Sequence, residues 1–119
     1  MNLLIVDDDK LVCMTLAAIF EESKINTDVA YSGAEAYSLL NEKPYDVMIT
    51  DIVMPDIDGF TLIKRVRSKY KKLRIIMMSG LVGINDMQSF IDSEQAEIEH
   101  ILYKPFDPAK LLALVNTTV

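Results

Sequence analysis

A chain of 119 residues fits a single domain over residues 1–119, and because half of its residues are apolar, it can bury one hydrophobic core. The net charge of −6 argues against direct binding of nucleic acid, and the apolar content excludes a disordered chain. No apolar run is long enough to cross a membrane, and a lone cysteine, Cys13, excludes an intramolecular disulfide. These features predict a cytoplasmic protein.

The first strand is predicted at Leu3–Val6, where a continuous apolar run indicates burial on both faces. Three aspartates at residues 7–9 end this strand. A helix is predicted from Lys10 to Ser23, and a second strand from Thr27 to Ala30 is half polar, which favours an edge of the sheet. The apolar stripe of the helix consists of Val12, Leu16, Ile19 and Phe20.

Ser32 and Glu35 have the spacing of a capping box, which begins a second helix that ends before Pro44. A third strand is predicted from Asp46 to Thr50, and it stops at Asp51, where a loop rich in Pro, Asp and Gly follows. The next helix, Gly59 to Tyr70, has an inward face made of Leu62, Ile63, Val66 and Tyr70. The basic run from residue 64 to residue 74 is interpreted as the solvated face of this helix rather than as a DNA-binding patch.

The fourth strand is predicted from Arg74 to Met78, and Ser79 follows it. A fourth helix, expected to be irregular, is predicted from the helical spacing of Ile84, Met87 and Ile91. The fifth strand is predicted at His100–Tyr103. The last helix begins with Asp107 as its N-cap and Pro108 at the first helical position.

Strands that alternate with helices predict a parallel sheet covered by helices on both faces. The carboxyl ends of parallel strands share one edge of the sheet, where such folds bind ligands. Polar residues stand at four of these predicted strand ends, namely Asp7 and Asp8, Asp51, Ser79 and Lys104.

These residue types suit phosphoryl transfer. Two close carboxylates repel each other by roughly 4 kcal/mol at a surface-like dielectric, and a Mg²⁺ ion with oxygen ligands would offset that repulsion. Lys104 offers a positive charge and Ser79 a hydroxyl donor to a phosphoryl oxygen, beside Asp51 as the nucleophile. Alternatively, Asp51 could cap a backbone amide in a turn, and residues 7–9 could cap the following helix, which is the preferred interpretation for Asp9.

Four motifs in this order resemble the receiver domain of response regulators in two-component signalling, over essentially the whole chain. They are Leu4–Asp9, Thr50–Pro55 with Asp58 and Gly59, Met78–Gly80, and Tyr103–Phe106.

The resemblance implies a flavodoxin-like, doubly wound α/β fold, with a five-stranded parallel sheet of order 2-1-3-4-5 flanked by five helices. It implies that Asp51 accepts a phosphoryl group from a phosphohistidine on a sensor histidine kinase or phosphotransfer protein. Asp8 and Asp51 would bind Mg²⁺ directly, Asp7 would bind it through water, and the backbone carbonyl of Val53 would be a further ligand.

The resemblance further implies that Lys104 contacts the phosphoryl group, that Ser79 moves toward it, and that the Lys104–Pro105 bond is cis. The output would pass through the fourth helix, the fifth strand and the last helix to an effector domain, a separate protein or a phosphorylation-dependent dimer. One departure affects this output, because Ile101 stands where receivers usually carry an aromatic switch residue. Tyr103 should face the other side of the strand.

Three other functions fit parts of this pattern. A Mg²⁺-dependent phosphatase with an Asp nucleophile needs a second Asp two residues later, where this chain has Val53. A flavin protein of the same fold needs a phosphate loop after the first strand, where the three aspartates would repel a phosphate. A docking module without phosphorylation would not need Asp8, Asp51, Ser79 and Lys104. The predicted function is therefore a signalling switch that phosphorylates itself but turns over no separate substrate.

Overall fold

The computed structural model describes residues 1–52, 54, 56–79, 100–103 and 107–117, without the side chains of residues 79, 100, 101, 103 and 117. Its strands are β1 (Asn2–Val6), β2 (Asn26–Ala30), β3 (Val47–Asp51), β4 (Arg74–Ser79) and β5 (His100–Tyr103). Its helices, within that part of the chain, are α1 (Lys10–Glu22), α2 (Gly33–Glu42), α3 (Gly59–Lys69) and α5 (Pro108–Thr117). The predicted elements agree with these to within one residue at most ends, and the fourth helix lies outside the described residues.

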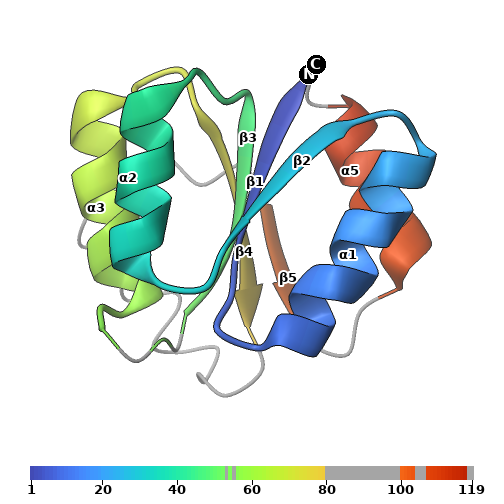
Figure 1. Cartoon of the computed structure of the whole chain (residues 1–119), viewed down its shortest axis with the longest axis horizontal. Helices are drawn as coiled ribbons and strands as arrows, with labels where there is room; N and C mark the ends of the chain where they lie inside the picture. The colour runs from blue at the N-terminus through green and yellow to red at the C-terminus, as the bar shows by residue number, and fades with distance from the viewer. Residues whose placement is uncertain (53, 55, 80–99, 104–106, 118–119) are drawn as a thin grey trace.

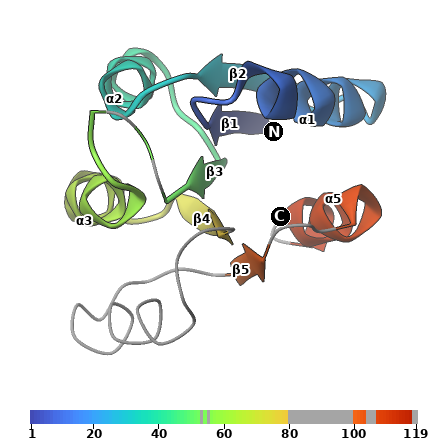
Figure 2. The same cartoon turned by 90° about the horizontal axis from the view of Figure 1, so that it is seen from below.

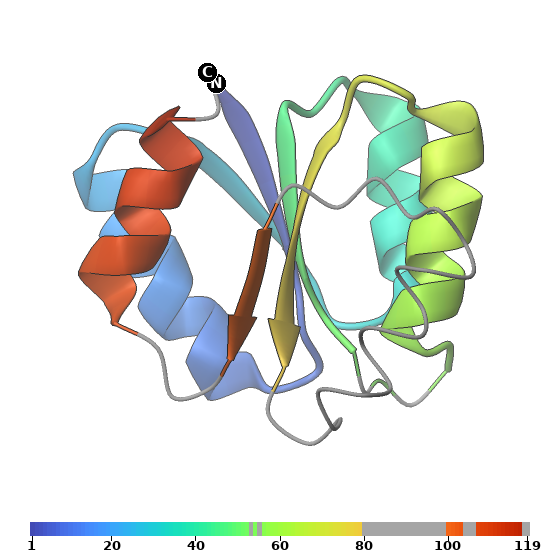
Figure 3. The ribbon, with the colours of Figure 1, turned by 180° about the vertical axis from the view of Figure 1, so that it is seen from behind.

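The strands form one parallel sheet in the order β2-β1-β3-β4-β5, which confirms the predicted topology. Figure 2 shows this order across the sheet, and Figure 3 shows β4 and β5 side by side with their arrowheads at the same end. β2 lies at an edge, as its half-polar sequence predicted, because a strand with one neighbour can leave polar side chains in water.

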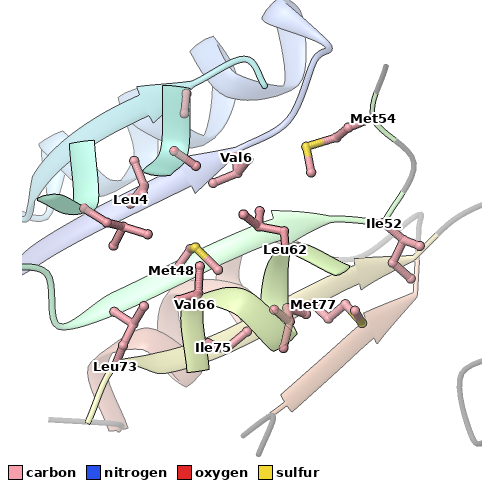
Figure 4. Close-up of a cluster of buried hydrophobic side chains, with 14 residues drawn as sticks. Leu4, Val6, Met48, Ile52, Met54, Leu62, Val66, Leu73, Ile75 and Met77 are labelled. Carbon is pink, nitrogen blue, oxygen red and sulfur yellow. The ribbon is translucent and has the colours of Figure 1, made fainter. Parts of the chain in front are cut away.

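Within the described residues, α2 and α3 cover one face of the sheet, and α1 and α5 cover the other (Figure 1). Side chains that alternate along each strand supply both layers of core. In β1, Leu4 and Val6 pack under α2 and α3, in the cluster drawn in Figure 4. Leu3 and Ile5 pack under α1 and α5. A sheet covered in this way needs the nearly continuous apolar strands that the sequence contains.

The helices begin at polar caps that the sequence marks. Asp9 Oδ1 accepts hydrogen bonds from the amides of Leu11 and Val12 at 2.9 and 3.3 Å, which confirms its predicted role as the N-cap of α1. The Ser32 hydroxyl accepts one from the Glu35 amide at 3.1 Å. The Glu35 carboxylate reaches back as predicted, but it accepts from the Tyr31 amide, one residue before the cap.

The apolar face of α1 is centred on Cys13, Leu16 and Phe20, which are buried, while Val12 and Ile19 are only half-buried. The inward face of α3 contains Leu62, Ile63 and Val66 as predicted, whereas Tyr70 follows the helix as its C-cap and is half-buried against the same core. No helix in the described part of the chain combines the length and the apolar character needed to cross a bilayer.

Candidate functional site

The register of β1 and β3 brings Asp7 beside Asp51. Ile5 is paired with Ile49, and both side chains lie in the core under α1 and α5. Asp7 extends this pattern beyond β1, since its N–H donates to the carbonyl of Ala30 at 3.1 Å. Because side chains alternate along a strand, Asp7 and Asp51, two residues further on, point to the same face. The carboxyl ends of adjacent strands therefore place two acids together.

Oxygens from the carboxylates of Asp7, Asp8 and Asp51 all lie within 4.8 Å of one another. Asp7 is fully buried, Asp51 is half-buried and Asp8 is exposed, so the cluster extends from the core to the surface. Asp7 Oδ1 accepts a hydrogen bond from the Asp9 amide at 2.9 Å, and Asp51 Oδ1 accepts one from the Ile52 amide at 2.8 Å. These bonds orient the two carboxylates.

This acidic cluster has the donor set of a hard divalent cation. All three side chains offer oxygen and lie at the carboxyl ends of two strands. They stand close enough to repel one another by several kcal/mol, roughly 4 per close pair at a surface-like dielectric. A small cation such as Mg²⁺ binds to a few carboxylates and keeps water or phosphate oxygens in its remaining positions. The three residues therefore fit such an ion, and the exposed Asp8 gives it a path from solvent.

Cys13 packs beneath the cluster and is not part of its chemistry. Its Sγ donates to the carbonyl of Asp7 at 3.2 Å. Burial, followed by the negative charges of Asp7 and Asp9, raises the pKa of the thiol to about 12. A thiol with that pKa is neutral at physiological pH, so Cys13 serves as a small core residue, as its helical position predicted.

The loop after Asp51 folds back onto the end of β3. The Gly59 amide donates to the Ile52 carbonyl at 2.6 Å. A Cβ at residue 59 would lie 2.5 Å from the Asp51 carbonyl oxygen and 2.7 Å from the Ile52 Cα, so only glycine allows this close approach. The Asp58 side chain accepts from the Thr61 amide at 2.8 Å and begins α3. Asp58 and Gly59 thus hold the chain that leaves the acidic cluster.

A second attachment of this loop, through Asp56, has no counterpart among the residues predicted from the sequence. Asp56 accepts hydrogen bonds from the backbone amides of Gly33 and Ala34, at the N-terminus of α2, with distances of 3.0 and 2.9 Å. Ile57 packs closely against Gly33, because a Cβ added to Gly33 would lie 1.9 Å from Cγ2 of Ile57. No local sequence pattern predicts this contact, because its partners are separated by more than 20 residues in the chain.

Several predicted site residues are not tested by these contacts. Val53 and Lys104 lie outside the described residues, as does the Lys104–Pro105 bond. Ser79 is described by its backbone alone, which ends β4 one residue after Met78, the partner of Asp51 in the ladder. The side chains of Ile101 and Tyr103 also lie outside the described set.

Comparison with known proteins agrees with this architecture. Residues 3–116 match the family model described as the response regulator receiver domain. Over 118 residues the chain is 31% identical to the "Probable transcriptional regulator ycf29" of Porphyra purpurea, with 99% of this chain and 56% of the relative covered. It is 32% identical to the transcriptional regulatory protein CusR of Escherichia coli K12, with 98% of this chain and 50% of that protein covered.

Among solved structures, the receiver domain of the Francisella response regulator 1452 superposes with a TM-score of 0.88. It is 32% identical, and the match covers 98% of this chain and 94% of that one. The chain spans about half the length of the two curated regulators named above. The family match over almost the whole chain shows that this protein belongs to the response regulator receiver domain family.

Proposed function

We propose that this chain is a phosphorylation-controlled switch of a two-component phosphorelay, with Asp51 as the phospho-acceptor. The observation that carries the proposal is the convergence of the Asp7, Asp8 and Asp51 carboxylates within 4.8 Å at the ends of two neighbouring strands. Asp51 stands on a rigid strand and is half-buried, so it is fixed in place and still reachable by a donor.

In this proposal, Asp8 and Asp51 would hold Mg²⁺ directly, Asp7 would hold it through water, and the carbonyl of Val53 would be a further ligand. The ion, when bound, would neutralise negative charge on the carboxylates and on the incoming phosphoryl oxygens. Asp7 is suited to its indirect role because it is the most buried of the three acids and already accepts the Asp9 amide.

The chemical step is an in-line transfer. A carboxylate oxygen of Asp51 forms a bond to phosphorus while the phosphorus–nitrogen bond of a phosphohistidine breaks, and the imidazole leaving group takes up a proton. Lys104 would balance charge on the phosphoryl group and Ser79 would donate a hydrogen bond to it. Water later hydrolyses the acyl phosphate, so the domain returns to its starting state without turning over a separate substrate.

The proposed donor is a sensor histidine kinase or a phosphotransfer protein, and the lone buried cysteine suits a reducing, cytoplasmic location. The output would act through the last helix and its neighbours on an effector domain, a separate protein or a second copy of the chain. The curated relatives ycf29 and CusR are named as regulators of transcription, which supports an effector of that class.

The test is phosphorylation with acetyl phosphate and Mg²⁺, followed by intact-protein mass spectrometry. The parent should gain one phosphoryl group, and Asp51→Asn should gain none. Asp46→Asn is a matched control, because it makes the same Asp-to-Asn change at an exposed carboxylate. Asp46 precedes the first residue of β3, whereas Asp51 is the last residue of that strand. If Asp51→Asn were labelled as fully as Asp46→Asn, Asp51 would not be the acceptor. Steady hydrolysis of an added phosphate ester would favour the phosphatase instead.

A further inference from the structure

The cations of this acidic protein are concentrated in one segment. Residues 64–74 contain seven of the twelve Lys and Arg residues and no acid, whereas all 18 acids belong to the rest of the chain. The seven are Lys64, Arg65, Arg67, Lys69, Lys71, Lys72 and Arg74. Such a separation of charge within one small domain creates a local positive field that the net charge of −6 conceals.

Part of this segment forms a wall of a groove of about 720 Å³ between residues 40–47 and 69–74, hereafter the basic groove. The groove lies at the amino ends of β3 and β4, where α2 leads into β3 and α3 leads into β4, at the end of the sheet away from Asp51 (Figure 1). Its charged lining consists of Lys43, Lys69, Lys71, Lys72 and Arg74 against Glu42 and Asp46.

Internal contacts already engage two of these cations. Lys43 Nζ forms an ion pair with Asp28 at 2.6 Å, and Lys69 Nζ donates to Asn41 Oδ1 at 2.7 Å. In the part of the chain that the structure describes, Lys71, Lys72 and Arg74 are exposed and their side chains have no carboxylate partner. Three adjacent positive charges on one rim of the groove are therefore available to a ligand.

The groove is held in shape without a ligand. The Tyr70 hydroxyl and Lys69 Nζ both donate to Asn41 Oδ1, which ties the end of α3 to the end of α2. Arg67 Nη1 donates to the carbonyls of Lys71 and Leu73 at 3.1 and 2.6 Å. These bonds fix the backbone of the segment that joins α3 to β4. A preformed site loses less conformational entropy when it binds.

The walls of the groove also contain apolar surface. The half-buried Tyr45 and Tyr70 belong to its lining, together with the buried residues Leu40, Val47 and Leu73. Aromatic and aliphatic walls beside a charged rim are typical of sites that bind a ligand with both apolar and charged groups.

We propose that the basic groove binds an acidic, partly apolar peptide segment of a partner protein. The exposed charges of Lys71, Lys72 and Arg74 follow one another along the chain as it enters β4, so they match carboxylates spread along a peptide better than one compact anion. Nucleic acid is disfavoured, because the 18 acids elsewhere on the domain would repel a long polyanion. Charges on the rim would mainly set the rate of association and its dependence on salt.

The test measures fluorescence anisotropy with a labelled peptide composed of Glu, Asp, Leu and Phe. It uses the Asp51→Asn background, so that phosphorylation plays no part and the outcome is independent of the proposed acceptor. The variant Lys71→Glu with Lys72→Glu should weaken binding about tenfold or more. The matched control is Lys24→Glu with Lys110→Glu, which changes the net charge equally at exposed residues outside the groove and should bind like the parent.

Equal weakening by both double variants would show a general charge effect and would overturn the proposal. So would the absence of peptide binding at low salt, or tighter binding of a single-stranded oligonucleotide than of the peptide. The milder variant Lys72→Ala with Arg74→Ala should also weaken binding, and circular dichroism checks that each variant is folded. A peptide in which every acid is replaced by its neutral amide, Asn or Gln, should bind at least as weakly as the acidic peptide binds to the Lys71→Glu, Lys72→Glu variant.

Discussion

Asp56 accepts two backbone hydrogen bonds at the N-terminus of α2, of which the one from Gly33 is 3.0 Å long. The bond joins the loop that follows the acidic cluster to a helix that begins 23 residues earlier in the chain. The helix N-terminus favours a negative charge, because its first amides have no partner within the helix. Asp56 therefore attaches the segment between Asp51 and α3 to the N-terminus of α2. Gly59 attaches the end of the same segment to the backbone of Ile52.

Asp56→Ala should lower the thermal unfolding midpoint, because the amides of Gly33 and Ala34 would lose their acceptor. Asp56→Asn should lower it less, since one amide oxygen can still accept. Differential scanning calorimetry measures both, with Glu22→Gln, at an exposed carboxylate of α1, as the control. An unchanged midpoint in Asp56→Ala would show that water replaces the carboxylate without loss.

The same contact should make stability depend on acid pH. The amide of Gly33, and next that of Ala34, hold the pKa of Asp56 below its ordinary value of 3.8. A carboxylate whose pKa is lower in the folded state stabilises the fold at pH values above its unfolded pKa, and this contribution is lost as pH falls through the folded pKa. The difference in unfolding midpoint between the parent and Asp56→Ala should therefore shrink as pH falls from about 5 through the folded pKa of Asp56. A difference that stays constant over this range would contradict the assignment.

Asp28 should add to that acid sensitivity. Its pKa is lowered by the hydrogen bond from Lys43 and, next, by the one from the Tyr45 hydroxyl at 2.6 Å.

Gly59→Ala should destabilise the fold by about 1–3 kcal/mol, the usual cost of forcing extra volume into packed structure. The new methyl group would meet the backbone of Asp51 and Ile52, neither of which can rotate away. Because the end of β3 must shift, phosphorylation by acetyl phosphate should also slow. Urea denaturation gives the first quantity, and Ser68→Ala, an exposed position in the same helix, is the control. Parent-like stability in Gly59→Ala would mean that the loop relaxes freely.

The Cys13 thiol should resist alkylation in the folded protein. It is fully buried and its pKa is raised to about 12, so almost no thiolate is present at pH 8. Iodoacetamide should label it only after urea unfolds the chain, as followed by mass spectrometry. Rapid labelling of the native protein would show that α1 opens readily.

Local patterns predicted much of this molecule. The N-cap role of Asp9 was predictable because its partners are two and three residues away. The edge position of β2 followed from its polar residues, and the meeting of Asp7 with Asp51 followed from the geometry of parallel strands. The strand order itself was implied by family resemblance and is confirmed by the sheet.

Contacts between distant segments could not be predicted in the same way. Asp56 lies in a segment whose residues are typical of an ordinary turn. Only the packing of Ile57 against Gly33 brings the Asp56 carboxylate to the N-terminus of α2. Glu35 accepts from Tyr31 rather than from Ser32, a difference of one residue that depends on the path of the chain leaving β2. The groove beside residues 69–74 likewise depends on how α2 and α3 end together.

Isothermal titration calorimetry with Mg²⁺ tests most directly whether three acids at the ends of two strands form one magnesium site. The parent should bind one ion, Asp8→Ala should bind it at least about tenfold more weakly, and Asp46→Asn should match the parent. Titration curves that are the same for Asp8→Ala and the parent would remove Asp8 from the ligand set and contradict the account.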